Sequence, residues 1–205
     1  MTDSPAHSWL LALVAVLLAV PVHAGGVEIT PFVGGRFGGT VTESGTNRDR
    51  DLDDAASFGL VFDLAVKDPG AFIEILWSHQ ETEVASSRGV FDLALDSVHV
   101  GGLFRWEERQ VQPFLNGGFG LTLFNGEGTE AHLSVMLGTG FRVPLGRRAA
   151  FRFDARGVGI VDSGRGGIFC SGGCLAAVSV AGTFQGEVTV GFSVELFGTA
   201  GENNP

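Results

Sequence analysis

The stretch AAFRFDARGVG, residues Ala149 to Gly159, decides the fold. Apolar and charged residues alternate through its middle: Phe151, Phe153 and Ala155 against Arg152, Asp154 and Arg156. Alternation at every second residue predicts a β-strand with one apolar and one polar face. The face that contacts water therefore decides whether this chain is a soluble protein or a membrane protein.

The same alternation recurs along the chain, and no segment after Gly25 shows a helical period. It predicts eight strands, at about 27–41, 57–67, 71–84, 93–106, 110–124, 132–145, 149–162 and 184–197. The connections after the second, fourth and sixth strands are tight, whereas those after the first, third, fifth and seventh are long. Short turns at one end and long loops at the other are typical of outer-membrane barrels. An even number of strands also places both chain ends at the end with the short turns.

Composition indicates which face is outside. The chain has 32 Gly, 17 Phe and a single lysine, Lys67, and the polar faces carry Gly and Ser with a few arginines and carboxylates. A solvated outer face normally carries many lysines, whereas small residues mixed with a few long ones suit the narrow interior of eight strands. The large apolar residues then face lipid, with Trp77 and Trp106 in an aromatic belt. We therefore expect an all-β, eight-stranded antiparallel up-and-down transmembrane β-barrel over residues 25–197, with a lipocalin-like secreted barrel as the alternative.

The two ends of the chain differ from the barrel. Residues 1–24 have an apolar run, Leu10 to Val20, and a small-residue site ending at Ala24, which predicts a cleaved signal peptide. Because no Lys or Arg precedes the run, an uncleaved anchor is the alternative. Residues 198–205 form a short polar tail. Loss of Asp3 with the signal changes the formal charge from −10 to −9, and this acidic balance argues against nucleic acid as a partner.

The last long connection, residues 163–183, carries both cysteines, Cys170 and Cys174. In an exported chain we expect them to form a local disulfide, because two thiols alone are a poor zinc site. We expect no metal and no cofactor. Four apolar residues surround the pair: Ile168, Phe169, Leu175 and Val178. Such a loop is either a binding surface or a cover folded over the barrel mouth.

Charged residues on the polar faces form the candidate site. Six carboxylates and five arginines are predicted to share one lumen: Glu28, Asp63, Glu74, Asp154, Glu187 and Glu195 with Arg36, Arg105, Arg142, Arg152 and Arg156. Charges in so confined a space need partners. The set is therefore either an ion-pair plug that fills the barrel or a narrow ion pathway with a gate.

Two further motifs are weaker. The loop NRDRDLDD, residues 47–54, spaces three aspartates like a calcium loop, but Asp54 and Leu60 replace the expected Gly and Glu. It is expected to be a solvated external loop, or a weak divalent-cation site shared with lipopolysaccharide. His132 and Ser134 have a spacing similar to that of the lipid A deacylase family, but Val135 replaces the expected Asn. No Glu lies between Leu133 and Gly186 to orient the histidine.

These features resemble the small eight-stranded outer-membrane β-barrels of Gram-negative bacteria, the OmpA-like and OmpX-like group. The last strand, GEVTVGFSVELF (186–197), resembles the terminal strand that such proteins present to the assembly machinery, although Phe197 is out of register with its apolar face. The resemblance implies a non-enzymatic, monomeric protein of the bacterial outer membrane with both termini periplasmic. Its expected partners are outer-membrane lipids, lipopolysaccharide and the assembly machinery. Its expected role is in membrane integrity or surface interaction through the loops, with a small porin-like channel for ions or hydrophobic solutes as the alternative, and a lipid A-modifying enzyme less favoured.

Overall fold

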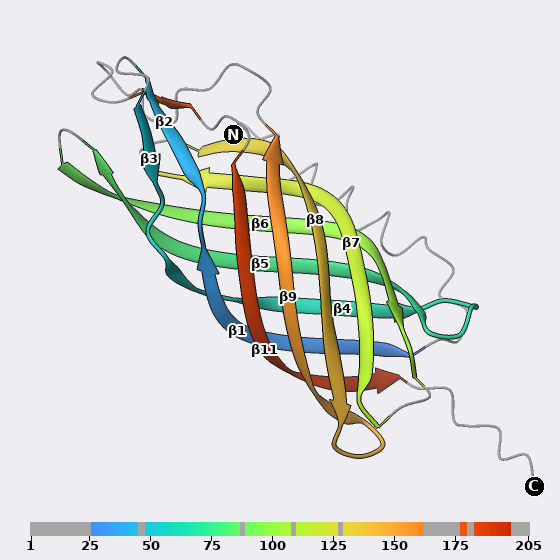
Figure 1. The fold of residues 1–205 in the computed structure, drawn as a ribbon. Helices are drawn as coiled ribbons and strands as arrows, with labels where there is room; N and C mark the ends of the chain where they lie inside the picture. The colour runs from blue at the N-terminus through green and yellow to red at the C-terminus, as the bar shows by residue number, and fades with distance from the viewer. Residues whose placement is uncertain are drawn as a thin grey trace, which may run out of the picture.

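Eight long strands close into an antiparallel β-barrel in the computed structural model, which describes residues 26–44, 48–86, 89–107, 110–126, 129–161, 177–179 and 183–197 (Figure 1). The barrel strands are β1 (Val27–Phe37), β4 (Ala55–Ala65), β5 (Ala71–Ser86), β6 (Gly89–Arg105), β7 (Gln112–Asn125), β8 (Thr129–Pro144), β9 (Ala149–Val161) and β11 (Phe184–Phe197). Each strand pairs with its neighbour in the chain, and β1 pairs with β11 to close the ring. The predicted fold class is confirmed.

No helix among the described residues is long and apolar enough to cross a bilayer.

The two ends of the barrel differ in their connections. At the turn end, β4, β6 and β8 are joined to the following strands through residues 66–70, 106–111 and 145–148. The barrel begins at this end with Val27 and finishes there with Phe197, which pairs with Val27. The register of β1 on β11 shifts between Val27 and Glu28, so that Phe197 lies opposite Val27. The opposite end, the loop end, carries the remaining connections.

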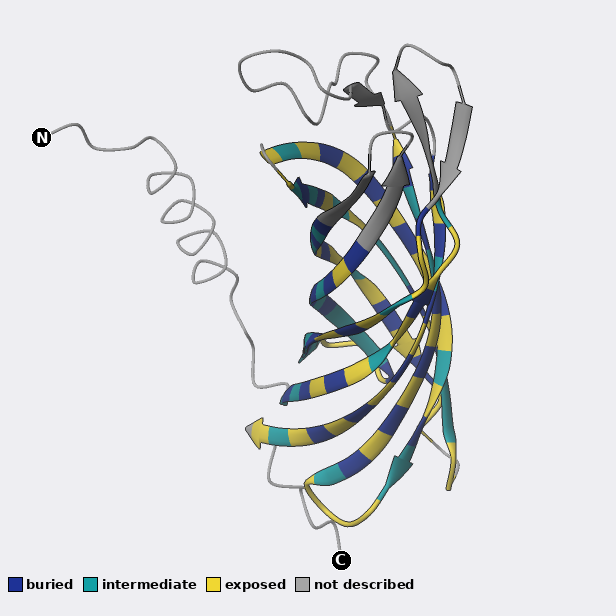
Figure 2. Ribbon diagram, turned by 90° about the vertical axis from the view of Figure 1, so that its left-hand side faces the viewer, coloured by how far each residue is buried: buried dark blue, intermediate teal, exposed yellow. Residues whose placement is uncertain are grey.

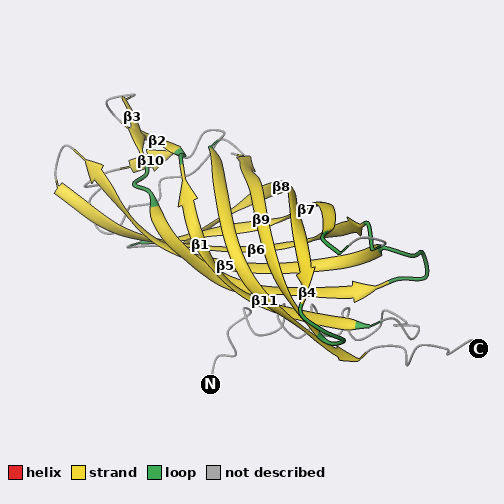
Figure 3. Cartoon of the chain, turned by 60° about the horizontal axis from the view of Figure 1, so that its bottom comes forward, coloured by secondary structure: helices red, strands yellow, loops and turns green. Residues whose placement is uncertain are grey.

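A second, small sheet lies at the loop end and corrects the expected extent of the first strand (Figure 3). It consists of β2 (Thr40–Ser44), β3 (Arg48–Asp51) and β10 (Ala177–Ser179), in the order β10-β2-β3. The predicted first strand, 27–41, is divided because Gly38 and Gly39 have positive φ values of 74° and 106°, a region that favours glycine. The acidic segment expected to be a solvated loop is therefore partly a hairpin.

This small sheet joins two distant connections. Strand β10 belongs to the segment 163–183 and pairs with β2, which follows β1. Leu52, directly after β3, is 3% exposed and packs with apolar residues of the barrel interior. Cys170 and Cys174, with Ile168, Phe169 and Leu175, lie outside the described residues, as do the predicted signal peptide and the C-terminal tail.

Burial alternates along the barrel strands wherever their side chains are described, as the banding in Figure 2 shows. Most charged and small polar residues of the barrel strands point inward and are buried, whereas most large apolar residues point outward, and a smaller apolar set is buried inside. On β8 alone, Leu133, Val135 and Leu137 are 64%, 53% and 75% exposed. A band of exposed Leu, Val and Phe around a closed barrel is the outer surface that lipid requires.

Candidate functional site in the barrel interior

Arg152 on β9 is the centre of the largest ion-pair cluster. Its Nη1 lies 2.7 Å from Asp63 Oδ2, its Nε lies 2.9 Å from Asp154 Oδ2, and its Nη2 binds Glu74 Oε2. Asp63 on β4 and Glu74 on β5 are direct cross-strand partners, and Asn116 donates a hydrogen bond of 2.8 Å to Glu74. The fixed fork of the guanidinium thus holds carboxylates from three strands. Arg152 is 2% exposed, so these charges are isolated from solvent.

Aromatic rings also face inward and stack on the arginines. The Arg152 guanidinium carbon lies 4.6 Å from the centre of the Phe114 ring, and that of Arg156 lies 4.8 Å from the Phe32 ring. Such cation–π contacts stabilise a charge that water cannot reach. Phe32 and Phe114 interrupt the polar pattern of their strands in the sequence, and these contacts explain why aromatic residues stand there.

The position of Phe114 depends on Gly140 of β8. A Cβ atom at residue 140 would lie 2.5 Å from Phe114 Cζ and 2.1 Å from the Phe153 carbonyl oxygen. Both distances are shorter than atoms tolerate, so only glycine allows the ring to lie over Arg152.

We therefore expect Gly140→Ala to lower the free energy of unfolding by about 1–3 kcal/mol through overpacking. Urea titration of the refolded protein measures this change. The matched control is Gly35→Ala, since a Cβ there meets nothing within 4 Å. Equal stability of the two alanine variants would contradict the role given to Gly140.

Glu28 is the centre of a second cluster, at the turn end. Arg142 Nη2 lies 2.8 Å from Glu28 Oε2, and Arg105 Nη1 lies 3.5 Å from Glu28 Oε1. Arg105 also contacts Glu107 at 2.9 Å. These residues line a cavity of about 590 Å³ that opens at this end. Glu195 lines the same cavity, but within the described part of the chain it has no ion pair, so the structure separates it from the predicted network.

A third cluster joins Arg36, Glu187 and Arg156. Arg36 Nη2 lies 3.4 Å from Glu187 Oε1, and Arg156 Nε lies 3.2 Å from Glu187 Oε2. Each of the two arginines also donates a hydrogen bond to a hydroxyl group: Arg36 to Ser78 at 2.6 Å, and Arg156 to Thr189 at 2.9 Å. Ten of the eleven predicted charges thus fall into three separate clusters.

Ser134 contacts a histidine that the sequence motif did not indicate. Ser134 Oγ and His99 Nε2 are 2.9 Å apart, and Thr122 donates to Ser134 at 3.1 Å. His132 instead lies near Glu130, with Nε2 3.6 Å from Oε2. Ser134 and His99 are each 1% exposed, and His99 Nδ1 has no hydrogen-bond partner. A buried serine and histidine without an orienting acid lack the arrangement of a catalytic triad.

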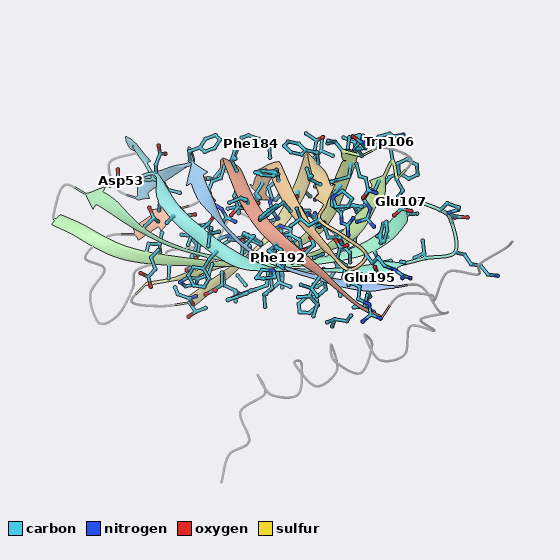
Figure 4. All side chains as sticks on the ribbon, turned by 90° about the horizontal axis from the view of Figure 1, so that it is seen from below. Asp53, Trp106, Glu107, Phe184, Phe192 and Glu195 are labelled. Carbon is cyan, nitrogen blue, oxygen red and sulfur yellow. The ribbon has the colours of Figure 1, made fainter. Side chains whose placement is uncertain are left out.

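The loop end has its own cavity, of about 800 Å³. Asp53, Asp54, Glu81, Thr82 and Asn125 are among its lining residues. Below it, the interior is filled by a cluster of buried apolar side chains, including Leu93, Leu95, Phe124, Val158 and Ile160. Figure 4 shows Asp53 at this end, with Glu107 and Glu195 toward the other. The two cavities are therefore separated by apolar packing and by ion pairs.

Both tryptophans predicted to form the belt point outward. Trp106 is 44% exposed and contacts Phe104 edge-on, with ring centres 5.1 Å apart, at the turn end (Figure 4). Trp77 is half-buried against Phe58, with ring centres 6.0 Å apart. Both lie on the apolar outer surface, Trp106 directly after β6 and Trp77 within β5 opposite Leu60, and the aromatic belt stays a prediction.

The sequence and the structure were compared with those of known proteins. No protein-family model and no curated protein matches the sequence. The structure is similar to that of Neisserial surface protein A, with a TM-score of 0.63, 12% identity, and coverage of 85% of this chain and 99% of that one. It is also similar to the outer membrane protein OprG from Pseudomonas aeruginosa, with a TM-score of 0.56, 14% identity, and coverage of 85% and 98%. The chain has the fold of a small outer-membrane β-barrel. A third such barrel, the outer membrane protein AlkL determined in lipid bilayers, matches with a TM-score of 0.55, 13% identity, and coverage of 87% and 94%.

Proposed function

We propose that this small outer-membrane β-barrel is a non-enzymatic integral protein of the bacterial outer membrane with a plugged lumen. It acts in membrane integrity or in surface interaction through its loop end. The observation that carries the proposal is the Arg152 cluster, in which one buried guanidinium ties together carboxylates from β4, β5 and β9. An eight-stranded barrel has an interior that side chains can fill, and these side chains cross it.

The outer surface and the connections support the location. The exposed apolar band would contact lipid, and the short connections at the turn end suit the periplasmic side. Both ends of the barrel, Val27 and Phe197, lie at the turn end, so both would be periplasmic. The loop end, with its small sheet, would then face the outside and contact lipopolysaccharide. Closure of the barrel sheet within one chain favours a monomer, inserted by the assembly machinery.

The absence of catalysis is inferred from access and geometry. Ser134 and His99 are the pair that most resembles a nucleophile with its base, but both are buried within the barrel. A substrate cannot reach them without unpacking the lumen.

The alternative function is a narrow channel. The cavities of about 800 Å³ and about 590 Å³ at the two ends favour it, because together they leave only the middle of the lumen to be opened. Movement of Arg152 away from its carboxylates would then act as a gate.

Planar-bilayer recording of the refolded protein separates the two functions. We expect no single-channel steps above the bilayer baseline, because ion pairs and apolar side chains fill the path. Folding is checked by the shift in gel mobility between unheated and heated samples. Regular conductance steps from fully folded wild-type protein would overturn the plug and favour the channel.

A further inference from the structure

We propose that the turn-end cavity binds a small zwitterionic amino carboxylate, a molecule with one ammonium and one carboxylate group. The cavity has a volume of about 590 Å³, which lies within the usual range for small-molecule sites. Three charged residues of its lining are buried by nine-tenths or more: Glu28, Arg105 and Arg142 are 4%, 7% and 9% exposed. A cavity with a few polar groups held in place by the fold is the usual setting for recognition of a small polar ligand.

Carboxylates occupy one half of the inner wall on the side of this cavity. Cross-strand register pairs Glu195 on β11 with Glu28 on β1. It also pairs Glu28 with Asp63 on β4, and Asp63 with Glu74 on β5. Direct cross-strand partners point to the same face of a sheet, so these carboxylates form one row across neighbouring strands, the acidic wall. Like charges directly opposite each other destabilise a sheet, so this row needs cations.

Arginines occupy the other half, the basic wall. Gln112 on β7 lies opposite Arg142 on β8, and Arg142 in turn lies opposite Arg152 on β9. Arg105 is the last residue of β6. In the ring order of the strands, β6, β7, β8 and β9 lie across the barrel from β11, β1, β4 and β5. Asp154, which pairs with Arg152 on β9, is the exception, so a separation of charge crosses the lumen from one wall to the other.

The two walls are connected in the interior but not at the mouth of the cavity. Further inside, ion pairs join them through Arg152 and Glu28. At the mouth, Glu195 and Arg147 line the cavity, and neither has an ion pair among the described residues. In addition, Arg142 Nε is buried without an acceptor, and Glu28 Oε1 accepts no hydrogen bond. An unused donor and an unused acceptor therefore stand on opposite walls of one cavity.

A small amino carboxylate matches both walls at once. Its ammonium contacts Glu195 and Glu28 on the acidic side. Its carboxylate contacts Arg142 and Arg147 on the basic side, because guanidinium N–H groups suit carboxylate oxygens. A ligand without net charge also keeps the balance of the lining, whose charged residues are four cations and four anions: Lys67, Arg105, Arg142 and Arg147 with Glu28, Asp68, Glu107 and Glu195. A cation or an anion alone would match one wall and leave the other without a partner.

Chemical-shift mapping with L-leucine and two blocked forms of it tests the class of ligand. L-Leucine carries both charges, L-leucinamide carries only the ammonium, and N-acetyl-L-leucine carries only the carboxylate. In the isotope-labelled, refolded protein, L-leucine should cause saturable shifts of the turn-end amides of Gly70 and Gly146 and none of Ala94 and Gly126 at the loop end. Each blocked form should bind about tenfold more weakly, the effect of losing one hydrogen bond between charged groups. No saturable shift with L-leucine, or equal affinity for either blocked form, overturns the proposal.

Glu195→Gln and Arg147→Gln test the two walls separately. Each variant removes one charge at the mouth and breaks no ion pair of the described residues, so both should fold. Each should weaken the binding of L-leucine about tenfold. Glu81→Gln, which removes an exposed carboxylate at the loop end, is the matched control and should bind as wild-type protein does. Wild-type affinity in either mouth variant overturns the proposal.

O-Phosphoethanolamine separates an amino carboxylate from a lipid headgroup, since it joins the same ammonium to a phosphate. It should bind more weakly than L-leucine, because a doubly charged phosphate adds net negative charge to a balanced lining. Tighter binding of O-phosphoethanolamine overturns the amino carboxylate as the ligand. The site lies at one mouth and needs no path through the barrel, so it holds whether the lumen is a plug or a channel. Bilayer conductance therefore tests only the proposed function.

Discussion

Replacement of Arg152 by methionine is expected to lower the free energy of unfolding by about 3–5 kcal/mol, the cost of breaking a buried ion pair from one side. The variant keeps an unbranched side chain over Phe114 but leaves Asp63, Glu74 and Asp154 buried without their shared cation. Mutual repulsion of three carboxylates adds to the loss. Urea titration in lipid vesicles, followed by tryptophan fluorescence, measures the change.

The control for Arg152→Met is Arg147→Gln, at an exposed position in the turn between β8 and β9. Arg147 is an exposed residue that lines the turn-end cavity and lies outside the three buried ion-pair clusters, so this variant removes one positive charge and should stay within about 0.5 kcal/mol of wild type. Adding Asp63→Asn to Arg152→Met should recover part of the stability, because it removes one of the three buried carboxylates that have lost their cation. A loss below about 1 kcal/mol for Arg152→Met would mean that the cluster does not hold the barrel together.

Strand positions could be predicted because a closed barrel imposes a period of two on every strand. Phe151, Arg152, Phe153 and Asp154 alternate outward and inward as their sequence indicates. The choice of the outer face rested on composition, and the exposed fraction of Leu137 agrees with it. In these strands the alternation of residue types in the sequence agrees with the alternation of buried and exposed side chains in the barrel.

The loop end could not be predicted, because its structure depends on contacts between distant segments. Nothing local in residues 177–179 indicates that they pair with β2, more than a hundred residues earlier. The end of β1 was detectable in principle, since Gly38 and Gly39 are adjacent glycines, but the apolar Val41 made the strand appear to continue. The pairing of β2 with β3 in the segment that follows was not predicted either.

The interior charges could be placed on one face but not paired. Alternation identifies which residues point inward, whereas pairing depends on strand register and on the tilt of the barrel. Register places Asp63 beside Glu74, two carboxylates whose repulsion Arg152 offsets by binding both. Glu195 shows the same limit: its strand position suits a lumen residue, but it lines the turn-end cavity and has no ion pair among the described residues. The contact between His99 and Ser134 likewise depends on strand register, which the sequence alone does not give.

The second large effect is expected on the outer surface, for Leu137→Arg. Leu137 lies in the middle of β8 and is 75% exposed. In a lipid bilayer, arginine at this depth should lower the free energy of unfolding by about 2–4 kcal/mol, because its charge must leave water for hydrocarbon. In a soluble barrel, arginine at so exposed a position would change stability by no more than about 0.5 kcal/mol. Urea titration in phospholipid vesicles distinguishes the two cases.

Leu145→Arg is the matched control for this experiment. Leu145 is also apolar and 53% exposed, but it follows β8 at the turn end, outside the band of the sheet. There the same substitution should cost only about 0–1 kcal/mol, the value for the membrane interface. A depth profile that is large at residue 137 and small at residue 145 requires a hydrocarbon layer around the middle of the barrel. Equal and small effects at both positions would show that the apolar band does not contact lipid, and a soluble barrel would then have to explain why its outer face is Leu, Val and Phe.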